Sequence, residues 1–137
     1  MRFLLDTCII SELAKPQSSP VKDFILNQPE ECLFLSVVTI GEITKGIELL
    51  ESSERKQKLK NWLSSLKKHY AEKILPITVE TSEIWGRITA KEQSNGRILG
   101  APDGLIAAIA LQHGLTLATR NIKDFSDTGV MLLNPWL

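Results

Sequence analysis

The chain lacks the features that several common protein classes require. Cysteine occurs only twice, with no CxxC pair and no His/Cys cluster, so neither a disulfide framework nor a zinc site is indicated. No apolar run reaches the roughly 18–20 residues that cross a bilayer. Asp6 interrupts the first apolar run, which argues against a signal peptide. These absences predict a cytoplasmic protein without a membrane segment, in which both cysteines are free thiols.

Excess charge and aromatic residues are also missing. The chain has 16 basic and 16 acidic residues, and aromatic residues make up 6% of it. Nucleic-acid-binding proteins usually carry a basic excess, and base stacking needs aromatic side chains, so composition argues mildly against that partner. Cations do gather between Arg55 and Lys73. That cluster favours a solvated helix face and leaves a local phosphate-binding patch as the alternative.

Several phosphate and hydrolase motifs are absent. The sequence contains no GxxxxGK[ST] loop, no GxGxxG fingerprint and no GxSxG elbow. An aspartyl-phosphate phosphatase would want a second aspartate two residues after Asp6, and Cys8 stands there instead. These classes are therefore poor explanations of the chain.

What the chain does have is a regular alternation of short apolar segments with helical patterns. Strands are expected at residues 2–5, 32–35, 74–79, 115–119 and 130–133, and helices at 8–15, 20–27, 36–50, 53–70, 80–93 and 102–113. Pro76 places the third strand at an edge of the sheet. At 137 residues the chain has the length of one domain. The pattern predicts a single α/β domain, residues 1–137, with a mostly parallel sheet.

Four carboxylates, far apart in the sequence, lie close to the expected element ends. Asp6 follows the first strand and Asp124 follows the fourth, Glu42 lies in the second turn of a helix, and Asp103 opens another. Ligand sites of parallel sheets lie beyond the carboxyl ends of the strands, so all four acids can reach the same rim. Gathered carboxylates repel one another unless a cation lies between them, and they suit Mg²⁺ or Mn²⁺. A metal-dependent hydrolase is therefore the first hypothesis.

Three of these acids also have ordinary structural explanations. Asp6 could cap the helix that follows it. Asp103 is favoured by the dipole of its helix whether or not it binds a ligand. Asp124 could be a simple loop acid. Taken singly, each structural role is at least as plausible as a catalytic one.

Glu42 has its own alternative, an ion pair with Lys45 three positions further on. Gly41 and Gly46 lie in the same expected helix. Since a glycine costs a helix roughly 1 kcal/mol against alanine, two of them suggest that something approaches this helix closely.

Five segments spread over the whole chain carry a further signal: residues 3–13, 36–43 with Gly46, 102–108, 117–125 and 134–136. In the same order they resemble the motifs of PIN-domain ribonucleases, specifically the VapC-type toxins of bacterial toxin–antitoxin pairs. Any one motif is weak, but five in register are strong. The resemblance implies a three-layer α/β/α fold with a mostly parallel five-stranded sheet. It also implies an endoribonuclease that hydrolyses RNA phosphodiester bonds with a water activated by Mg²⁺ or Mn²⁺.

The resemblance also implies roles for individual residues. The catalytic acids would be Asp6, Glu42, Asp103 and Asp124, with Asp6 and Asp103 as the surest metal ligands, Glu42 as a third, and Thr7, Ser11, Thr119 and Asn121 in support. Some relatives carry an acid where Asn121 stands, so Asp124 has the weakest claim on the metal. The family more often has asparagine at the position of Cys8, and a thiol is a weaker hydrogen-bond donor beside Asp6.

The implied partners are an RNA substrate, a cognate antitoxin that occludes the active site, and a second copy of the chain in a homodimer. Two alternatives remain open. A catalytically weak PIN-like module would bind RNA or a protein without cleavage. A metal-dependent phosphatase would act on a nucleotide ester and leave RNA intact.

Overall fold

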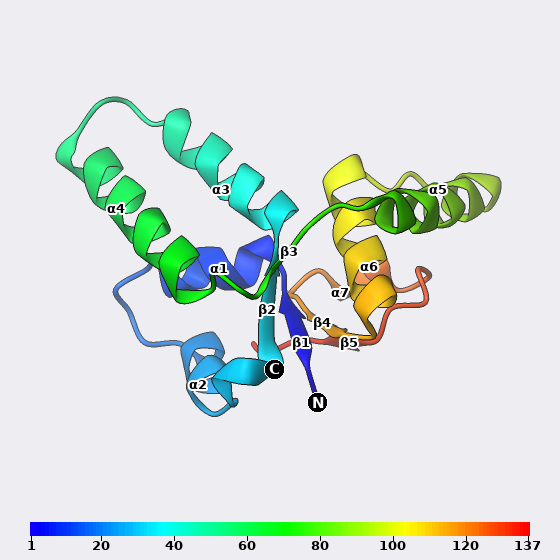
Figure 1. Cartoon of the computed structure of the whole chain (residues 1–137), viewed down its shortest axis with the longest axis horizontal. Helices are drawn as coiled ribbons and strands as arrows, with labels where there is room; N and C mark the ends of the chain where they lie inside the picture. The colour runs from blue at the N-terminus through cyan, green and yellow to red at the C-terminus, as the bar shows by residue number, and fades with distance from the viewer.

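The computed structural model describes residues 1–137 as three layers, with one sheet between two groups of helices (Figure 1). The strands are β1 (Phe3–Leu5), β2 (Leu33–Ser36), β3 (Ile74–Leu75), β4 (Thr116–Ala118) and β5 (Leu132–Leu133). The helices are α1 (Thr7–Leu13), α2 (Pro20–Leu26), α3 (Val37–Glu48), α4 (Glu54–His69), α5 (Val79–Ser94), α6 (Ala101–His113) and α7 (Ile122–Phe125), with a 3-10 turn at Glu30–Cys32. No helix is both long and apolar enough to cross a membrane.

The five strands form one sheet in the order β3-β2-β1-β4-β5, and every neighbouring pair is parallel. The expected five-stranded parallel sheet is therefore confirmed, and so is the edge position of β3. Strands β2 and β3 lie on one side of β1, and β4 and β5 lie on its other side. Because strand order reverses between β1 and β4, their carboxyl ends flank the crevice in which such folds bind ligands.

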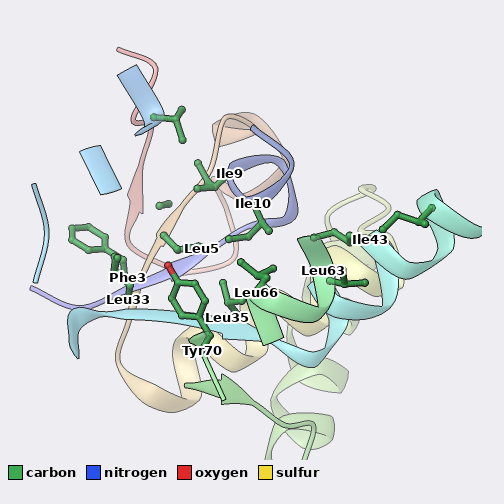
Figure 2. Packing of buried hydrophobic residues seen from close by; sticks show 13 residues of the cluster. Phe3, Leu5, Ile9, Ile10, Leu33, Leu35, Ile43, Leu63, Leu66 and Tyr70 are labelled. Atoms are coloured by element: carbon green, nitrogen blue, oxygen red, sulfur yellow. The ribbon is translucent and has the colours of Figure 1, made fainter. Parts of the chain in front are cut away.

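Strand β1 contributes to both faces of the sheet, as the two-residue period of a strand requires. Phe3 and Leu5 join a buried cluster under α1, α2, α3 and α4 (Figure 2). Leu4 joins a second cluster, under α5, α6 and α7, that also contains Leu117 of β4. Leu4 and Leu5 are fully buried. A strand that is apolar on both faces belongs in the centre of a covered sheet, and this fixes the rim on which Asp6 lies.

Polar side chains and one glycine set the ends of the principal helices. Ser36 caps α3 by accepting the Thr39 N–H at 3.1 Å, as expected. Thr78 and Thr81 form a capping box at the start of α5. Gly114 ends α6 in the left-handed region, at φ 63°, which confirms it as the stop of this helix.

Most element bounds differ from the expected ones by one or two residues, as at β5, which starts at Leu132 rather than Val130, and three differences have a clear local cause. Strand β3 ends at Leu75 rather than Val79, because the Thr78 cap already begins α5. Cys32 closes the 3-10 turn, so β2 starts one residue later than predicted. Helix α7 was not predicted, because a single turn is too short to show a helical period.

The expectation drawn from Gly41 and Gly46 is wrong within this chain. A Cβ atom at either position would meet nothing within 4 Å. The close approach lies instead at Gly104 of α6, where a Cβ would stand 2.9 Å from the Trp85 indole of α5. Gly104 therefore allows α5 and α6 to pack closely, directly beside Asp103.

Candidate active site

Asp6 directly follows β1, and both of its carboxylate oxygens are held by protein groups. Its Oδ1 accepts the backbone N–H of Thr7 at 2.8 Å, which caps α1. Its Oδ2 accepts the hydroxyl of Thr119 at 2.7 Å, and the side chain is only 3% exposed. Asp6 therefore both caps α1 and lies on the rim of the sheet, and the two hydrogen bonds orient its carboxylate at the end of the central strand.

Thr119 lies at the end of β4 and is fully buried. Its Oγ1 accepts the backbone N–H of Asn121 at 3.0 Å, which leaves the hydroxyl proton to point at Asp6. Asn121 thus acts through its backbone, since its side chain is exposed and makes no hydrogen bond. This pair joins β1 to β4 across the switch in strand order.

Glu42 of α3 is half-buried and bonded to α1 rather than to Lys45. The Thr7 hydroxyl donates to Glu42 Oε1 at 2.6 Å and lies 3.0 Å from Thr39 Oγ1. Thr39 is fully buried and was missed by the sequence reasoning. A signal was available, because Thr39 shares the inward stripe of Ile43 and Ile47 at helical spacing.

Asp103 lies in the first turn of α6, half-buried and facing the other acids. The pKa of the Asp103 carboxyl is raised to about 6. Burial is the largest cause, followed by the charges of Asp6, Glu42 and Asp124 in that order. The fold therefore brings the four predicted acids close enough to repel one another.

The carboxylates on the rim differ in how well their spacing and their chemistry suit a divalent cation. No group of three or more Asp, Glu, His or Cys side chains is gathered tightly enough in this arrangement to hold a metal ion. The donors are nevertheless all carboxylate oxygens, which suit Mg²⁺ or Mn²⁺. The charges of Asp6, Glu42 and Asp124 all act on Asp103, where they add to burial in raising the pKa of its carboxyl. In donor chemistry and in charge, Asp6, Asp103 and Glu42 fit a hard cation.

Two cavities flank the acids. One, of about 320 Å³, contains Asp103 and Asp124, and Asp124 is exposed on the short helix α7. The other, of about 510 Å³, lies among α1, α3 and α4 and contains Thr7, Ser11 and Glu42. Ser11 is exposed and makes no side-chain hydrogen bond. The rim is therefore open on both sides.

Cys8 lies beside Asp6, at the position where the resemblance implied an asparagine. Its Sγ lies 3.7 Å from Asp6 Oδ2 and accepts the backbone N–H of Arg120 at 3.5 Å. Burial raises the pKa of the thiol, so Cys8 stays neutral and adds no charge to the rim. Its long contact contributes little orientation, and Thr119 supplies the short bond.

Arg120, a positively charged residue, directly follows Thr119. The Arg120 guanidinium lies over the ring of Trp136, 4.1 Å from its centroid. Trp136 belongs to the closing motif of the sequence, and its backbone N–H donates to Asn134 Oδ1 at 2.9 Å. The sequence offered no reason to pair residues 120 and 136, and only the fold brings them together.

A parallel sheet with acids at its strand-order switch defines the class of this protein. Residues 3–130 match the PIN domain family. The chain belongs to that family, and the resemblance carried by the five motifs is confirmed.

The relatives narrow the class to VapC-type proteins. The chain is 36% identical to Toxin FitB of Neisseria gonorrhoeae over 136 residues, covering 98% of each. It is 33% identical over 136 residues to VapC ribonuclease Y4jK of Sinorhizobium fredii, covering 98% of this chain and 97% of the relative. The solved structure of FitAB bound to the IR36 DNA fragment matches with a TM-score of 0.92 at 34% identity, covering 98% and 96% of the two chains.

Proposed function

We propose that this protein is a metal-dependent endoribonuclease toxin that hydrolyses RNA phosphodiester bonds. The observation that carries the proposal is the meeting of Asp6, Glu42, Asp103 and Asp124 at the strand-order switch, where burial and the charges of the other three acids raise the pKa of Asp103 to about 6. Relatives named as a VapC ribonuclease and as a toxin support the substrate class and the biological role.

The side chains of the site have different roles: some would bind the metal and others orient the metal ligands. Asp6, Asp103 and Glu42 would hold Mg²⁺ or Mn²⁺, which when bound supplies an activated water and neutralises charge on the phosphodiester. Thr119 keeps Asp6 oriented through its hydroxyl, and Thr7 keeps Glu42 oriented in the same way. Asp124 is the acid with the smallest share, and it acts from the exposed helix α7.

The direct test is cleavage of total RNA with Mg²⁺ or Mn²⁺, compared with EDTA. Asp6→Asn and Asp103→Asn should each abolish cleavage while the protein stays folded by circular dichroism. Asp23→Asn, the same chemical change on the exposed surface of α2, is the matched control and should cut like the parent. If both rim variants cut as fast as the parent, the assignment of the site is wrong.

An antitoxin that inhibits the enzyme is part of the proposal. The FitB relative is named a toxin, and FitAB has been solved on DNA. The 510 Å³ cavity supports an occluding partner, because a segment that filled it would cover Glu42 and Thr7. Co-expression with the adjacent short reading frame should yield a stable complex with little RNase activity. Free toxin that keeps full activity in the presence of that product would contradict this part.

We also propose a cytoplasmic homodimer as the working form. Light scattering on the purified protein should give about twice the 15.3 kDa chain mass. A monomer at every concentration would remove this part of the proposal and leave the chemistry untouched.

The second candidate is a PIN-like module that binds RNA without cutting it. It is favoured by one observation, the absence of three acidic side chains already gathered around a cation position. RNA binding without cleavage, after removal of any co-purified partner and with Mn²⁺ present, would select this candidate.

A further inference from the structure

Helix α7, which carries Asp124, is weakly defined on its own. It is four residues long and its N-terminus has no side-chain cap. A single turn gains too few hydrogen bonds to be stable in isolation. The position of Asp124 must therefore be set by contacts from outside the helix.

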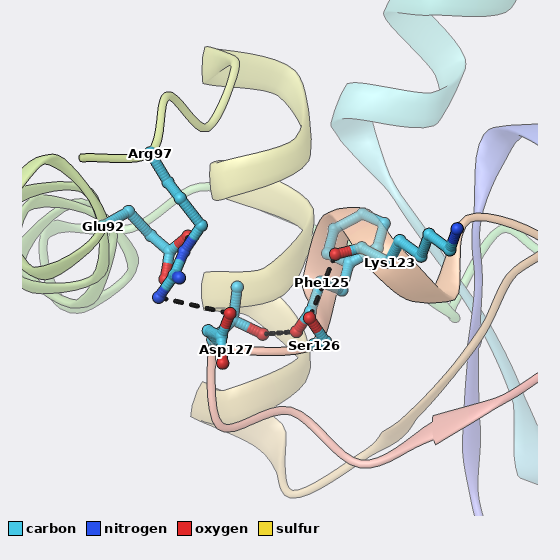
Figure 3. Close-up of polar contacts among 7 residues, drawn as sticks. Glu92, Arg97, Lys123, Phe125, Ser126 and Asp127 are labelled. Carbon is cyan, nitrogen blue, oxygen red and sulfur yellow. Dashed lines mark hydrogen bonds and ion pairs between the residues drawn. The ribbon is translucent and has the colours of Figure 1, made fainter. Parts of the chain in front are cut away.

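Contacts at the C-terminal end of α7 hold it to the segment that follows (Figure 3). Phe125 is fully buried, and its carbonyl accepts the Thr128 hydroxyl at 2.6 Å. The Ser126 hydroxyl donates to the Lys123 carbonyl at 3.1 Å. These bonds close the turn, but none of them reaches the helix that carries Asp103.

Packing fixes only part of the spacing between Asp124 and Asp103. Phe125, next to Asp124, lies in one buried cluster with Ile106 and Ala107 of α6 and so anchors the C-terminal end of α7. The 320 Å³ cavity borders both acids, and its other walls include Glu92, Arg97 and Lys123. A second connection, on the wall of this cavity, would fix the side of α7 that carries Asp124.

Arg97 supplies that connection. Its Nε donates to Glu92 Oε2 at 3.1 Å, and its Nη2 lies 3.2 Å from Asp127 Oδ2 (Figure 3). Glu92 belongs to α5, which packs against α6 at Gly104, beside Asp103. Asp127 lies two residues after α7. The Glu92–Arg97–Asp127 bridge therefore spans from the α5–α6 unit to the segment that anchors α7.

The buried end of the bridge is unusual. Glu92 is 4% exposed, its Oε1 has no hydrogen-bond partner, and Arg97 is its only charged partner. A buried carboxylate is costly without a counter-charge, so Glu92 holds the guanidinium firmly. An exposed pair between Arg97 and Asp127 alone would be too weak to fix a helix.

We infer that the Glu92–Arg97–Asp127 bridge positions Asp124 against Asp103 and so completes the acidic site. The three bridge residues are positioning residues, because they act on the site only through the placement of α7. This inference rests on the proposed function, since it assigns Asp124 a part in the same metal-dependent site.

The cleanest variant is Asp127→Asn, which cuts the half-exposed link and leaves Glu92 paired with Arg97. We expect kcat for RNA cleavage to fall about tenfold and Mn²⁺ affinity to fall similarly, as for other residues that orient metal ligands, with KM within about twofold of the parent. Arg97→Lys keeps a charge beside Glu92 but is too short and unforked to hold both acids, so it should behave like Asp127→Asn. Asp23→Asn on α2 is the matched control.

A double-mutant cycle separates positioning from general damage. If the bridge acts through Asp124, Asp127→Asn should add nothing in an Asp124→Asn background, both in cleavage and in Mn²⁺ affinity measured calorimetrically. If the losses caused by Asp127→Asn and Asp124→Asn multiply in the double variant, the inference is overturned. An Asp124→Asn variant that cuts RNA and binds Mn²⁺ like the parent would also overturn it. If the parent binds Mn²⁺ but does not cut RNA, the proposed function fails, and the cycle is decided on Mn²⁺ affinity alone.

Discussion

At the scale of single residues, a buried threonine orients the carboxylate of Asp6. Thr119 Oγ1 accepts the backbone N–H of Asn121, so its own hydroxyl proton points at Asp6. The Sγ of Cys8 lies 3.7 Å from Asp6 Oδ2. The short bond is charge-assisted, and the long sulfur contact is weak. The orientation of Asp6 therefore depends on Thr119 more than on Cys8.

Thr119→Val should test this dependence. The substitution keeps the shape but removes the bond to Asp6, so we expect RNA cleavage to fall about tenfold, as for other groups that orient a metal ligand. Thr44→Val is the control, since Thr44 is exposed and bonds only to the Ile40 carbonyl. Equal cleavage rates for the two variants would show that Thr119 is dispensable.

Asp103 should make stability depend on pH. Its folded pKa of about 6 lies above the ordinary 3.8, so the folded state binds the proton more tightly than the unfolded state. Its contribution to stability is fully present below pH 4 and is lost as pH rises through 6. Asp103→Asn should therefore raise the free energy of unfolding at pH 7 by about 1–2 kcal/mol, after allowance for screening at a half-exposed site.

Urea unfolding of parent and variant at pH 4, 5.5 and 7, without metal, measures this difference. The gap between the two proteins should narrow as pH falls toward 4. A gap that is constant with pH would mean that neither burial nor the neighbouring acids raise the pKa of Asp103 in the folded protein.

At the scale of elements, the spacing of α5 and α6 depends on one missing side chain. Gly104 faces the Trp85 indole at a distance that a methyl group would violate, whereas Gly41 of α3 faces open space. Sequence pattern alone had pointed to the wrong glycine, because a glycine's neighbours are set by how helices pack and not by its own helix.

This contrast gives a paired prediction. Gly104→Ala should destabilise the protein by about 1–3 kcal/mol through overpacking, and should impair cleavage because Asp103 adjoins the contact. Gly41→Ala should stabilise it by up to about 1 kcal/mol through helix propensity. Thermal unfolding of the two variants checks both signs, and a neutral Gly104→Ala would show that Trp85 moves aside freely.

At the scale of the whole molecule, the chain has no net charge and must hold RNA through local cations. Arg120 is one of these, because the ring of Trp136 holds its guanidinium just after the Asp6–Thr119 pair. The affinity of the protein for RNA should therefore depend only weakly on salt concentration, because only a few phosphate contacts are made.

Arg120→Gln should raise KM for RNA by about tenfold, the loss expected for one charge-assisted contact, with kcat little changed. It should also reduce the salt slope of binding by about 0.7, the value for one single-strand phosphate contact. Arg87→Gln, on the exposed face of α5, is the control for charge. An unchanged salt slope would place the RNA elsewhere.

The sequence by itself determined the alternation of strands and helices, the edge position of β3 and the family, and it singled out the four acids as candidates. Each of these depends on local period, a local residue type or a local motif. Only the tertiary structure decided which partners hold the acids. Thr119 and Asp6 are 113 residues apart and meet because β4 lies beside β1. Thr7 and Glu42 are 35 apart and meet because β2 lies on the other side of β1. The raised pKa of Asp103 and the Arg97 bridge arise from the same long-range packing, which no local pattern encodes.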